Sequence, residues 1–215
     1  MKIKKILISQ PTPKVQNSPY INLAKRYNLQ IDFRPFIEVE GIEVEEFRKQ
    51  RIDILDHQNV VFTSRTSIRH FFRICENLRI TVPESMKYFC CSEAVALYLQ
   101  KYITYRKRKV FFEKKDENSL VDLIKAKKTP GKILLPISDN NQHKIARQLQ
   151  RAKLKFTKAP VYRTIQTNLS DIPEKNYDIF VFYSPHGIKS FLENFPEFEQ
   201  NDVHIASFGD STAKA

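Results

Sequence analysis

The chain has 215 residues, enough for one large domain or two small ones. Hydrophobic residues make up 41% and charged residues 28% of it, which excludes an intrinsically disordered protein. The formal net charge of +12 favours an anionic partner, namely nucleic acid, an anionic membrane or a polycarboxylate, and the plain alternative is a surface of solvated lysines.

Short apolar runs alternate with amphipathic, helix-like segments along the chain. Because strands separated by helices form parallel sheets with right-handed crossovers, and continuous apolar runs suit strands covered on both faces, the sequence predicts an α/β protein. The expected strands are Lys5–Ser9, Gln30–Arg34, Asn59–Thr63, Lys87–Cys91, Lys109–Phe112, Lys132–Pro136, Asp178–Tyr183 and Val203–Phe208. The expected helices include Thr66–Leu78, Ser92–Tyr102, Asn118–Lys127, Asn140–Ala152 and His186–Asn194.

An internal repeat indicates two lobes. The stretch from Val61 to Phe71 aligns with the stretch from Val181 to Phe191, sharing Val, Phe, Ser, Ile and Phe, and Lys5–Ile8 parallels Lys132–Leu135. The repeat is circularly permuted, so one lobe is discontinuous in sequence. We therefore expect two flavodoxin-like parallel-sheet lobes.

The expected boundaries follow from this repeat. Residues 1–35 and 168–215 form the first lobe, residues 41–157 the second, and residues 36–40 and 158–167 are extended linkers. Pro35 and Pro160 suit exposed connections better than a central strand. Because the second lobe has further elements after the aligned repeat, the alignment also predicts a strand and a helix beyond Ala215.

The amino-terminal run of basic and then apolar residues is too short for a signal peptide, and no stretch approaches the roughly 20 apolar residues that span a bilayer. Cys75, Cys90 and Cys91 fit a reducing compartment, and the adjacent pair is expected to point to opposite faces of a strand in structural roles. We expect a soluble cytoplasmic protein. The scattered histidines show no metal-ligand spacing, so no metal is predicted.

The positive charge is unevenly distributed. Between Lys101 and Lys115 there are seven Lys or Arg residues and one acid, and between Asn141 and Lys158 there are six and no acid. Such runs attract polyanions.

Polar residues follow most of the expected strands. In parallel sheets, ligands bind beyond the carboxyl ends of the strands, where helices begin. Ser64, Ser184 and Thr212 are expected there, either as helix caps alone or also as ligands for carboxylates or phosphates. Glycine-rich phosphate loops, Gly-x-Ser-x-Gly and nucleophile–base sets are absent, so a catalyst here would bind and fold its substrate.

Several motifs, in this order, resemble those of the uroporphyrinogen-III synthase family across nearly the whole chain. They are Ser18-Pro19-Tyr20 with Pro35, Val61-Phe62-Thr63-Ser64, Leu134-Leu135-Pro136, Val161-Tyr162-Arg163-Thr164, Phe182-Tyr183-Ser184-Pro185 and Gly209-Asp210-Ser211-Thr212-Ala213. The resemblance implies a cofactor-free enzyme that cyclises hydroxymethylbilane with loss of water and inversion of the last pyrrole ring. Its partner would be a linear tetrapyrrole with eight carboxylates, not nucleic acid or a membrane, and the chain would act as a monomer.

The resemblance also implies roles for individual residues. Tyr162 matches the tyrosine that assists the departing hydroxyl as a donor, with packing of the linker as its structural alternative. Ser64, Ser184 and Thr212 match carboxylate-binding positions. Arg65 stands where proline is common and adds a carboxylate contact, and Ser138 lies in the polar loop after Pro136.

One loop departs from the family pattern. Where members carry Gly-x-x-Thr-Ala, this chain reads Cys91-Ser92-Glu93-Ala94-Val95. A diverged, non-catalytic homologue that binds a tetrapyrrole or another polyanion is therefore the second hypothesis. The third is a nucleic-acid binder using Lys101–Lys115, although that run matches no nucleic-acid-binding motif.

Overall fold

The structure is a computed structural model, and it describes residues 3–13, 18–113, 119–128, 130–139, 144–173 and 176–215. The first residues of the helices expected over Asn118–Lys127 and Asn140–Ala152 lie outside these ranges, as do Lys114 and Lys115 of the basic run. The chain divides into two compact units, one made of Met1–Val39 with Thr164–Ala215 and the other of Glu40–Arg163.

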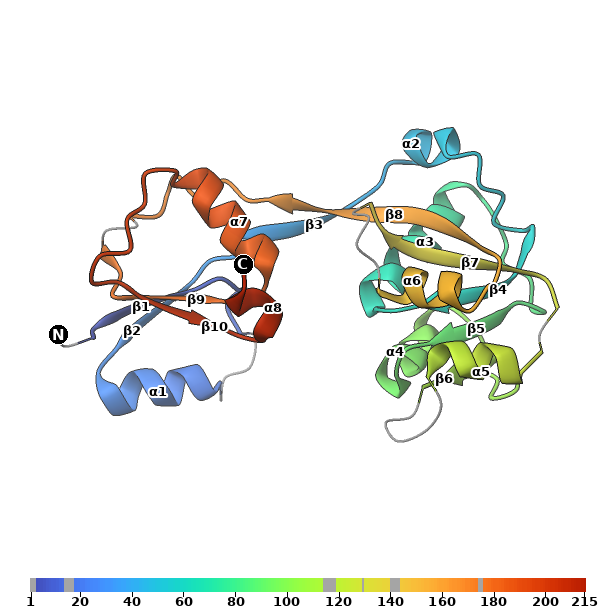
Figure 1. Cartoon of the computed structure of the whole chain (residues 1–215), viewed down its shortest axis with the longest axis horizontal. Coiled ribbons are helices and arrows are strands. Elements are labelled where there is room, and N and C mark those ends of the chain that lie inside the picture. The colour runs from blue at the N-terminus through green and yellow to red at the C-terminus, as the bar shows by residue number, and fades with distance from the viewer. Residues whose placement is uncertain (1–2, 14–17, 114–118, 129, 140–143, 174–175) are drawn as a thin grey trace. The chain divides into compact units, whose positions relative to one another are not determined.

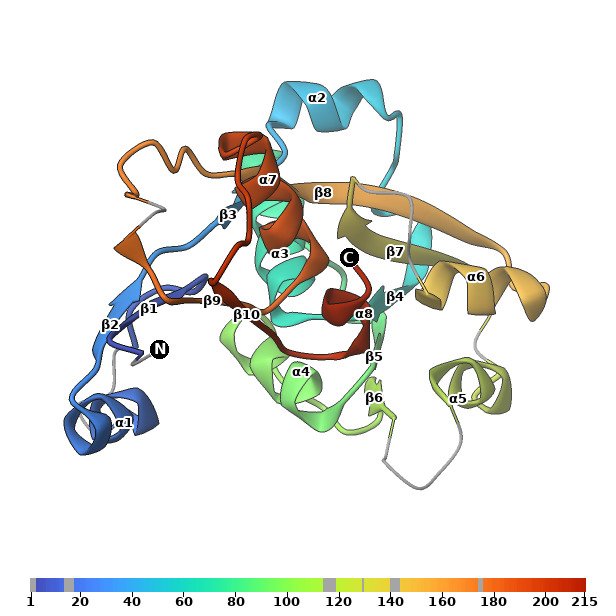
Figure 2. The ribbon, with the colours of Figure 1, turned by 60° about the vertical axis from the view of Figure 1, so that its left-hand side comes forward.

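The first unit is a four-stranded parallel sheet in the order β10-β9-β1-β2 (Figure 1). Its helices α1 and α7 lie on opposite sides of that sheet, as Figures 1 and 2 both show. This arrangement follows from right-handed crossovers that leave the two central strands in opposite directions. The elements are β1 (Lys5–Ile8), α1 (Pro19–Tyr27), β2 (Gln30–Phe33), β9 (Ile179–Phe182), α7 (Pro185–Asn194), β10 (His204–Ser207) and α8 (Asp210–Ala213).

Aromatic side chains dominate the core of the first unit. Phe191 on α7 lies at its centre, with ring centroids 4.8 Å from Phe180, 5.6 Å from Phe182, 5.7 Å from Phe36 and 4.8 Å from Phe198. Because offset and edge-to-face rings are attracted beyond the burial of their area, this cluster fastens α7 to the sheet.

The second unit contains a six-stranded sheet in the order β3-β8-β7-β4-β5-β6. Pairs of strands from β8 to β6 are parallel. The strands are β3 (Ile37–Gly41), β4 (His57–Phe62), β5 (Lys87–Cys90), β6 (Val110–Phe112), β7 (Lys132–Ser138) and β8 (Phe156–Gln166). The predicted α/β class with parallel sheets is confirmed, because the expected strands agree with these to within two residues.

Helices cover both faces of this sheet and enclose two cores. The core that includes Ile68, Phe71 and Val95 joins one face to α3 and α4, and the core that includes Ile124 and Leu149 joins the other face to α5 and α6. The helical elements are α2 (Val44–Lys49), α3 (Arg65–Asn77), α4 (Glu93–Tyr98), the 3₁₀ turn η1 (Leu99–Lys101), α5 (Leu120–Ala126) and α6 (Lys144–Arg151).

A proline shapes the middle of the sheet. Strand β7 pairs with β8 as far as Ser138, but its pairing with β4 ends at Val60 and Leu134. The same register would place Val61 opposite Leu135 and then Phe62 opposite Pro136, which has no N–H to donate. The β4–β7 ladder therefore stops before the strands do.

The segments expected to be extended linker strands lie in β3 and β8. Pro160 was expected to mark an exposed connection, and this is wrong, because β8 lies between β3 and β7 and its neighbours Ala159 and Val161 are fully buried. The carbonyl of Pro160 accepts a hydrogen bond from Gln50 Nε2 at 3.1 Å. Proline is tolerated here because β8 keeps its ladder with β7 through the neighbouring residues. Within the described residues, no helix is long and apolar enough to cross a bilayer.

Candidate functional site

Ser64 follows strand β4 at the carboxyl edge of the second unit's sheet, and it caps α3. Its hydroxyl accepts a hydrogen bond from Ser67 N at 3.0 Å, while Ser67 Oγ accepts one from Ser64 N at 3.3 Å. This reciprocal capping box uses the hydroxyl only as an acceptor, so its own hydrogen is left to donate. Arg65, the next residue, is exposed, and its guanidinium carbon lies 5.8 Å from the centre of the Tyr98 ring.

Tyr162 lies beside the carboxyl end of β7. It is the register partner of Ser138, and its carbonyl accepts a hydrogen bond from Asp139 N at 3.0 Å. Its half-buried ring stacks on His70 of α3, with centroids 5.6 Å apart and planes 28° apart. The structure thus brings together two of the predicted residues, Ser138 and Tyr162, and fixes the tyrosine ring from a helix that the sequence analysis did not connect with it.

His70 is buried between cationic neighbours. Burial lowers its pKa to about 4, and Arg69 and Arg73 add to this effect. The imidazole is therefore neutral at pH 7, and its Nε2, 3.3 Å from an Arg69 nitrogen, faces a group that only donates. Because the His70 ring is neutral, it packs against Tyr162 without adding a positive charge to those of Arg69 and Arg73.

Arg163 anchors the segment that follows Tyr162. It forms a salt bridge with Glu46 of α2, and its Nε lies 3.8 Å from Asp139 Oδ2. The hydrogen bond from Glu46 raises the pKa of Arg163, which keeps the guanidinium charged. Arg163 already has two acids beside it. It therefore helps to hold the backbone of Tyr162 in place and is not an unpaired cation for the substrate.

The loop that departs from the family pattern is well ordered by short-range contacts. Ser92 caps α4 by accepting from Val95 N at 3.4 Å, and Cys91 Sγ donates to Thr63 O at 3.0 Å. Burial raises the pKa of Cys91, which disfavours the thiolate, the nucleophilic form of the side chain. The expected structural role of the cysteines fits these contacts, and Cys75, Cys90 and Cys91 are all free thiols.

A cavity of about 320 Å³ opens at the same edge. It is lined by Thr63 and Cys91 at the ends of β4 and β5, by Glu113 after β6, and by Ser119 and Lys144 where α5 and α6 begin. Hydroxyl groups, a lysine and two helix starts make this cavity able to hold a carboxylate, although Glu113 opposes it.

The first unit has its own set of polar groups at the carboxyl edge. Ser184 caps α7 by accepting from Gly187 N at 3.1 Å, and a Cβ added to Gly187 would lie 3.5 Å from Ser184 Oγ and 3.8 Å from Ser9 Oγ. Both hydroxyls thus lie next to the position that a side chain at residue 187 would fill. Thr212, in contrast, is only 2% exposed in α8, which leaves its hydroxyl little room for a ligand.

A pair of tyrosines adjoins these serines. Tyr183, between β9 and Ser184, places its hydroxyl 2.5 Å from that of Tyr20 at the start of α1. Burial and the Tyr20 contact raise the pKa of Tyr183 to about 12. The exposed Phe208 stacks on the Tyr183 ring at 4.4 Å.

The basic runs do not both reach these edges. Arg106 and Lys109 precede β6, at the amino ends of the strands, and both lie against Glu84. In the second run, Lys144 reaches the carboxyl edge because α6 begins there. The predicted attraction of an anion to this edge therefore depends on few cations, with amides and hydroxyls supplying the rest.

The family model described as uroporphyrinogen-III synthase HemD matches residues 18–215. The chain belongs to the uroporphyrinogen-III synthase family. The resemblance inferred from its motifs is confirmed, and so is the function inferred with it, the cyclisation of hydroxymethylbilane to uroporphyrinogen III.

Solved structures of uroporphyrinogen-III synthases share the fold at low sequence identity. The enzyme from Helicobacter pylori aligns with a TM-score of 0.63 and 17% identity, over 99% of this chain and 87% of its own. A mutant enzyme from the extremely thermophilic bacterium Thermus thermophilus aligns with a TM-score of 0.62 and 12% identity, over 98% and 87% of the two chains. Comparison with curated protein sequences gives no match.

Some residues beside the predicted site of this uroporphyrinogen-III synthase family member are not recognisable from its sequence. His70 and Tyr162 are far apart in the sequence, and no motif links them. Tyr20 and Tyr183 each stood inside a quoted motif, but their pairing became visible only in the fold. The one indication in the sequence that Tyr183 belongs to the site is its position directly before Ser184, the residue that caps α7.

Proposed function

We propose that the chain carries out the family reaction as a cyclising lyase, with Tyr162 as the hydrogen-bond donor to the departing hydroxyl. The pyrrole nitrogen of the terminal ring expels this hydroxyl as the C–O bond breaks, and the donated proton lets it leave as water. The observation that carries the proposal is the position of Tyr162, opposite Ser138 at the end of β7 and stacked on a neutral His70.

Binding of the substrate would rest on helix starts. Ser64 and Ser184 each use the hydroxyl as an acceptor toward their own helix, so each retains an O–H for a substrate carboxylate. Arg65 is exposed and adds a cation, and Ser138 lies beside Tyr162. Holding an eight-carboxylate chain so that one ring carbon closes before another is a positioning effect. Thr212 is the weakest member of this set because it is buried.

The decisive experiment is an assay with enzymatically made hydroxymethylbilane. Uroporphyrinogen III is the product expected from the purified chain, and only the spontaneous type I isomer would identify a non-catalytic homologue. Tyr162→Phe should lower kcat by roughly 10²-fold while far-ultraviolet circular dichroism stays unchanged. Tyr105→Phe, which alters a half-buried tyrosine of the same unit, is the matched control. An unchanged rate for Tyr162→Phe would remove that residue from the mechanism.

We also propose that the chain acts as a cytoplasmic monomer on this small molecule, without nucleic acid. Three free thiols support a reducing compartment. Light scattering with size-exclusion chromatography tests the monomer, and a salt-dependent shift of a nonspecific duplex, lost on neutralising Arg106, Lys107 and Arg108, would contradict the absence of nucleic acid.

A further inference from the structure

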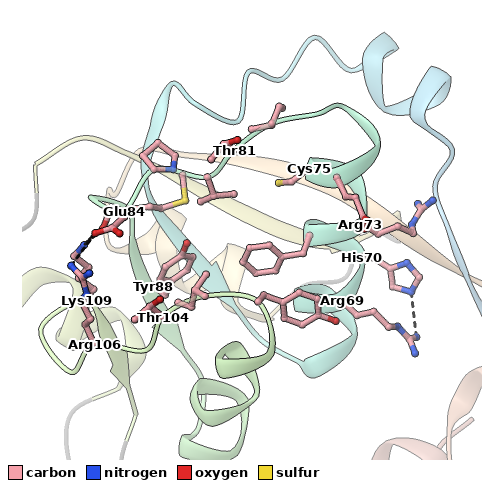
Figure 3. Close-up of a pocket in the computed structure, with 18 residues that line it drawn as sticks. Arg69, His70, Arg73, Cys75, Thr81, Glu84, Tyr88, Thr104, Arg106 and Lys109 are labelled. Carbon is pink, nitrogen blue, oxygen red and sulfur yellow. Dashed lines mark hydrogen bonds and ion pairs between the residues drawn. The ribbon is translucent and has the colours of Figure 1, made fainter.

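A cavity of about 610 Å³ lies within the second unit (Figure 3). One end of it reaches His70, whose ring stacks on Tyr162, and the rest extends away from that contact. It runs along α3 toward the segments Ile80–Met86 and Thr104–Lys109, which lead into the amino ends of β5 and β6. Strand-end ligands of parallel sheets bind at the opposite, carboxyl ends. Beyond His70, this cavity is therefore distinct from the strand-end loops.

Apolar and aromatic side chains form most of its wall. Phe72 and Tyr102 stack with ring centroids 4.7 Å apart and planes 7° apart, and Tyr102 is 37% exposed. Met86 and Tyr88 are buried beside them. Cavities of ~300–1,000 Å³ that combine an apolar, aromatic wall with polar groups are typical of small-molecule sites, and stacked rings favour a flat ligand.

Charged side chains lie at both ends of the cavity, and Arg73 and Glu76 of α3 also line it, with Glu76 opposing an anion. Figure 3 shows Arg106 and Lys109 beside Glu84 at one end and Arg69, with His70, at the other. Arg106 is 3.0 Å from Glu84 Oε2 and Lys109 also contacts Glu84, so an acid already offsets these cations.

Arg69 is the cation best able to bind an anion. A guanidinium has five N–H donors, and the structure pairs one Arg69 nitrogen with His70 at 3.3 Å. Arg69 is exposed. It is also close enough to the aromatic stack for its charge to lower the pKa of Tyr102, against the larger rise that burial causes. Arg73, also in the cavity wall, is committed to the carbonyl of Ile42.

We propose that this cavity is a second ligand site, which binds a small, flat organic anion. The aromatic body of the ligand lies against Phe72 and Tyr102, and its carboxylate or sulfonate pairs with Arg69. Cations at the far end, neutralised by Glu84, add little to this binding. The site functions without the substrate of the strand-end loops, so its occupancy is measurable on the free chain.

The probe for the test is 1-anilinonaphthalene-8-sulfonate, an aromatic sulfonate whose fluorescence rises on binding. Its titration with the full chain should saturate. Arg69→Ala and Tyr102→Ala should each raise the dissociation constant roughly tenfold or more, the equivalent of losing one charged hydrogen bond or one ring contact. Tyr102→Phe, which keeps the ring, should stay within about threefold of wild type, as should Arg151→Ala, a matched removal of an exposed arginine on α6.

Two measurements on the wild-type chain do not depend on how the variants fold. The uncharged N-phenyl-1-naphthylamine should bind at least roughly tenfold more weakly than the sulfonate. Saturating sulfonate should slow amide hydrogen exchange in residues 80–88 and 102–109. Equal affinity for the two probes, protection confined to other segments, or unchanged dissociation constants in Arg69→Ala and Tyr102→Ala would each overturn the proposal.

Discussion

The hydroxyl groups of Tyr20 and Tyr183 lie 2.5 Å apart and tie the start of α1 to the end of β9. One phenol donates to the other, and the accepting phenol keeps a hydrogen to donate onward. Phe33 packs edge-on against Tyr20 and Phe208 stacks on Tyr183, so both rings are held from the side.

Tyr183→Phe removes this hydrogen bond but keeps the ring. It should lower the free energy of unfolding by about 1 kcal/mol at pH 7, measured by urea titration. Because the folded pKa of Tyr183 is raised to about 12 from about 10, wild-type stability should fall as the pH rises from 10 to 12, and the variant should show a shallower fall. Tyr27→Phe, at an exposed tyrosine of α1, should change neither quantity; equal slopes for wild type and Tyr183→Phe would contradict this assignment.

Substitution of Ser64 separates its capping role from its proposed substrate contact. Ser64→Ala loses the bond from Ser67 N and should cost ~1 kcal/mol of stability. Ser64→Asp keeps an acceptor and suits the helix N-terminus, so its stability should stay near wild type. Its carboxylate would repel the substrate, and KM for hydroxymethylbilane should rise roughly tenfold or more. A wild-type KM for Ser64→Asp would exclude Ser64 from the substrate contact.

The lowered pKa of His70 predicts a specific loss of stability in acid. In the unfolded chain the imidazole titrates near its ordinary pKa of ~6.5, and in the folded chain near 4. Stability is therefore complete above pH 6.5 and falls as the pH drops from 6.5 toward 4, because the unfolded state binds the proton first. The loss by pH 5 should be on the order of 1–2 kcal/mol.

Urea unfolding at pH 7 and pH 5 measures this loss. His70→Gln should lack it, whereas His186→Gln, at an exposed position of α7, should retain the wild-type difference. If His70→Gln and His186→Gln show the same fall in the free energy of unfolding between pH 7 and pH 5, the buried imidazole of His70 does not cause the acid destabilisation.

The aromatic core of the first unit predicts a large cavity effect. Phe191→Ala should lower the free energy of unfolding of this unit by about 3–5 kcal/mol, since the ring touches several other rings and the space cannot collapse. Leu192→Ala is the matched control on the same helix, because Leu192 is 49% exposed, and it should change stability by less than ~0.5 kcal/mol. Calorimetry should show the Phe191→Ala loss in one transition if the units unfold separately.

Much of the fold was predictable from the sequence because the strands are covered on both faces. Burial on two sides requires continuous apolar runs, and runs such as Val60–Phe62 and Leu134–Leu135 are unambiguous. Helix α2 was not predicted, since it has six residues and buries only Phe47, too few for a periodic pattern. The interior position of Pro160 was also missed, because sequence alone does not reveal which neighbour supplies a strand's remaining hydrogen bonds.

The candidate site was predictable in part. Helix caps such as Ser64 and Ser184 follow apolar strands, so their place at the carboxyl edge is a local property. Long-range partners are not local: His70 meets Tyr162 only because α3 packs beside β8. The contact between Tyr20 and Tyr183 is also long-range. It depends on the strand order in which β1 lies between β9 and β2, and the spacing of residues in the sequence does not predict that order.

Pro136 acts as a spacer written into the covalent backbone. A residue with an N–H at this position would allow β4 and β7 to continue their ladder by one more hydrogen bond. The end of this pairing is thus set by the backbone chemistry of one residue, and not by a side-chain contact that a substrate could displace. A Pro136→Val exchange would extend the pairing of β7 with β4 toward Ser138 without replacing any residue proposed to meet the substrate.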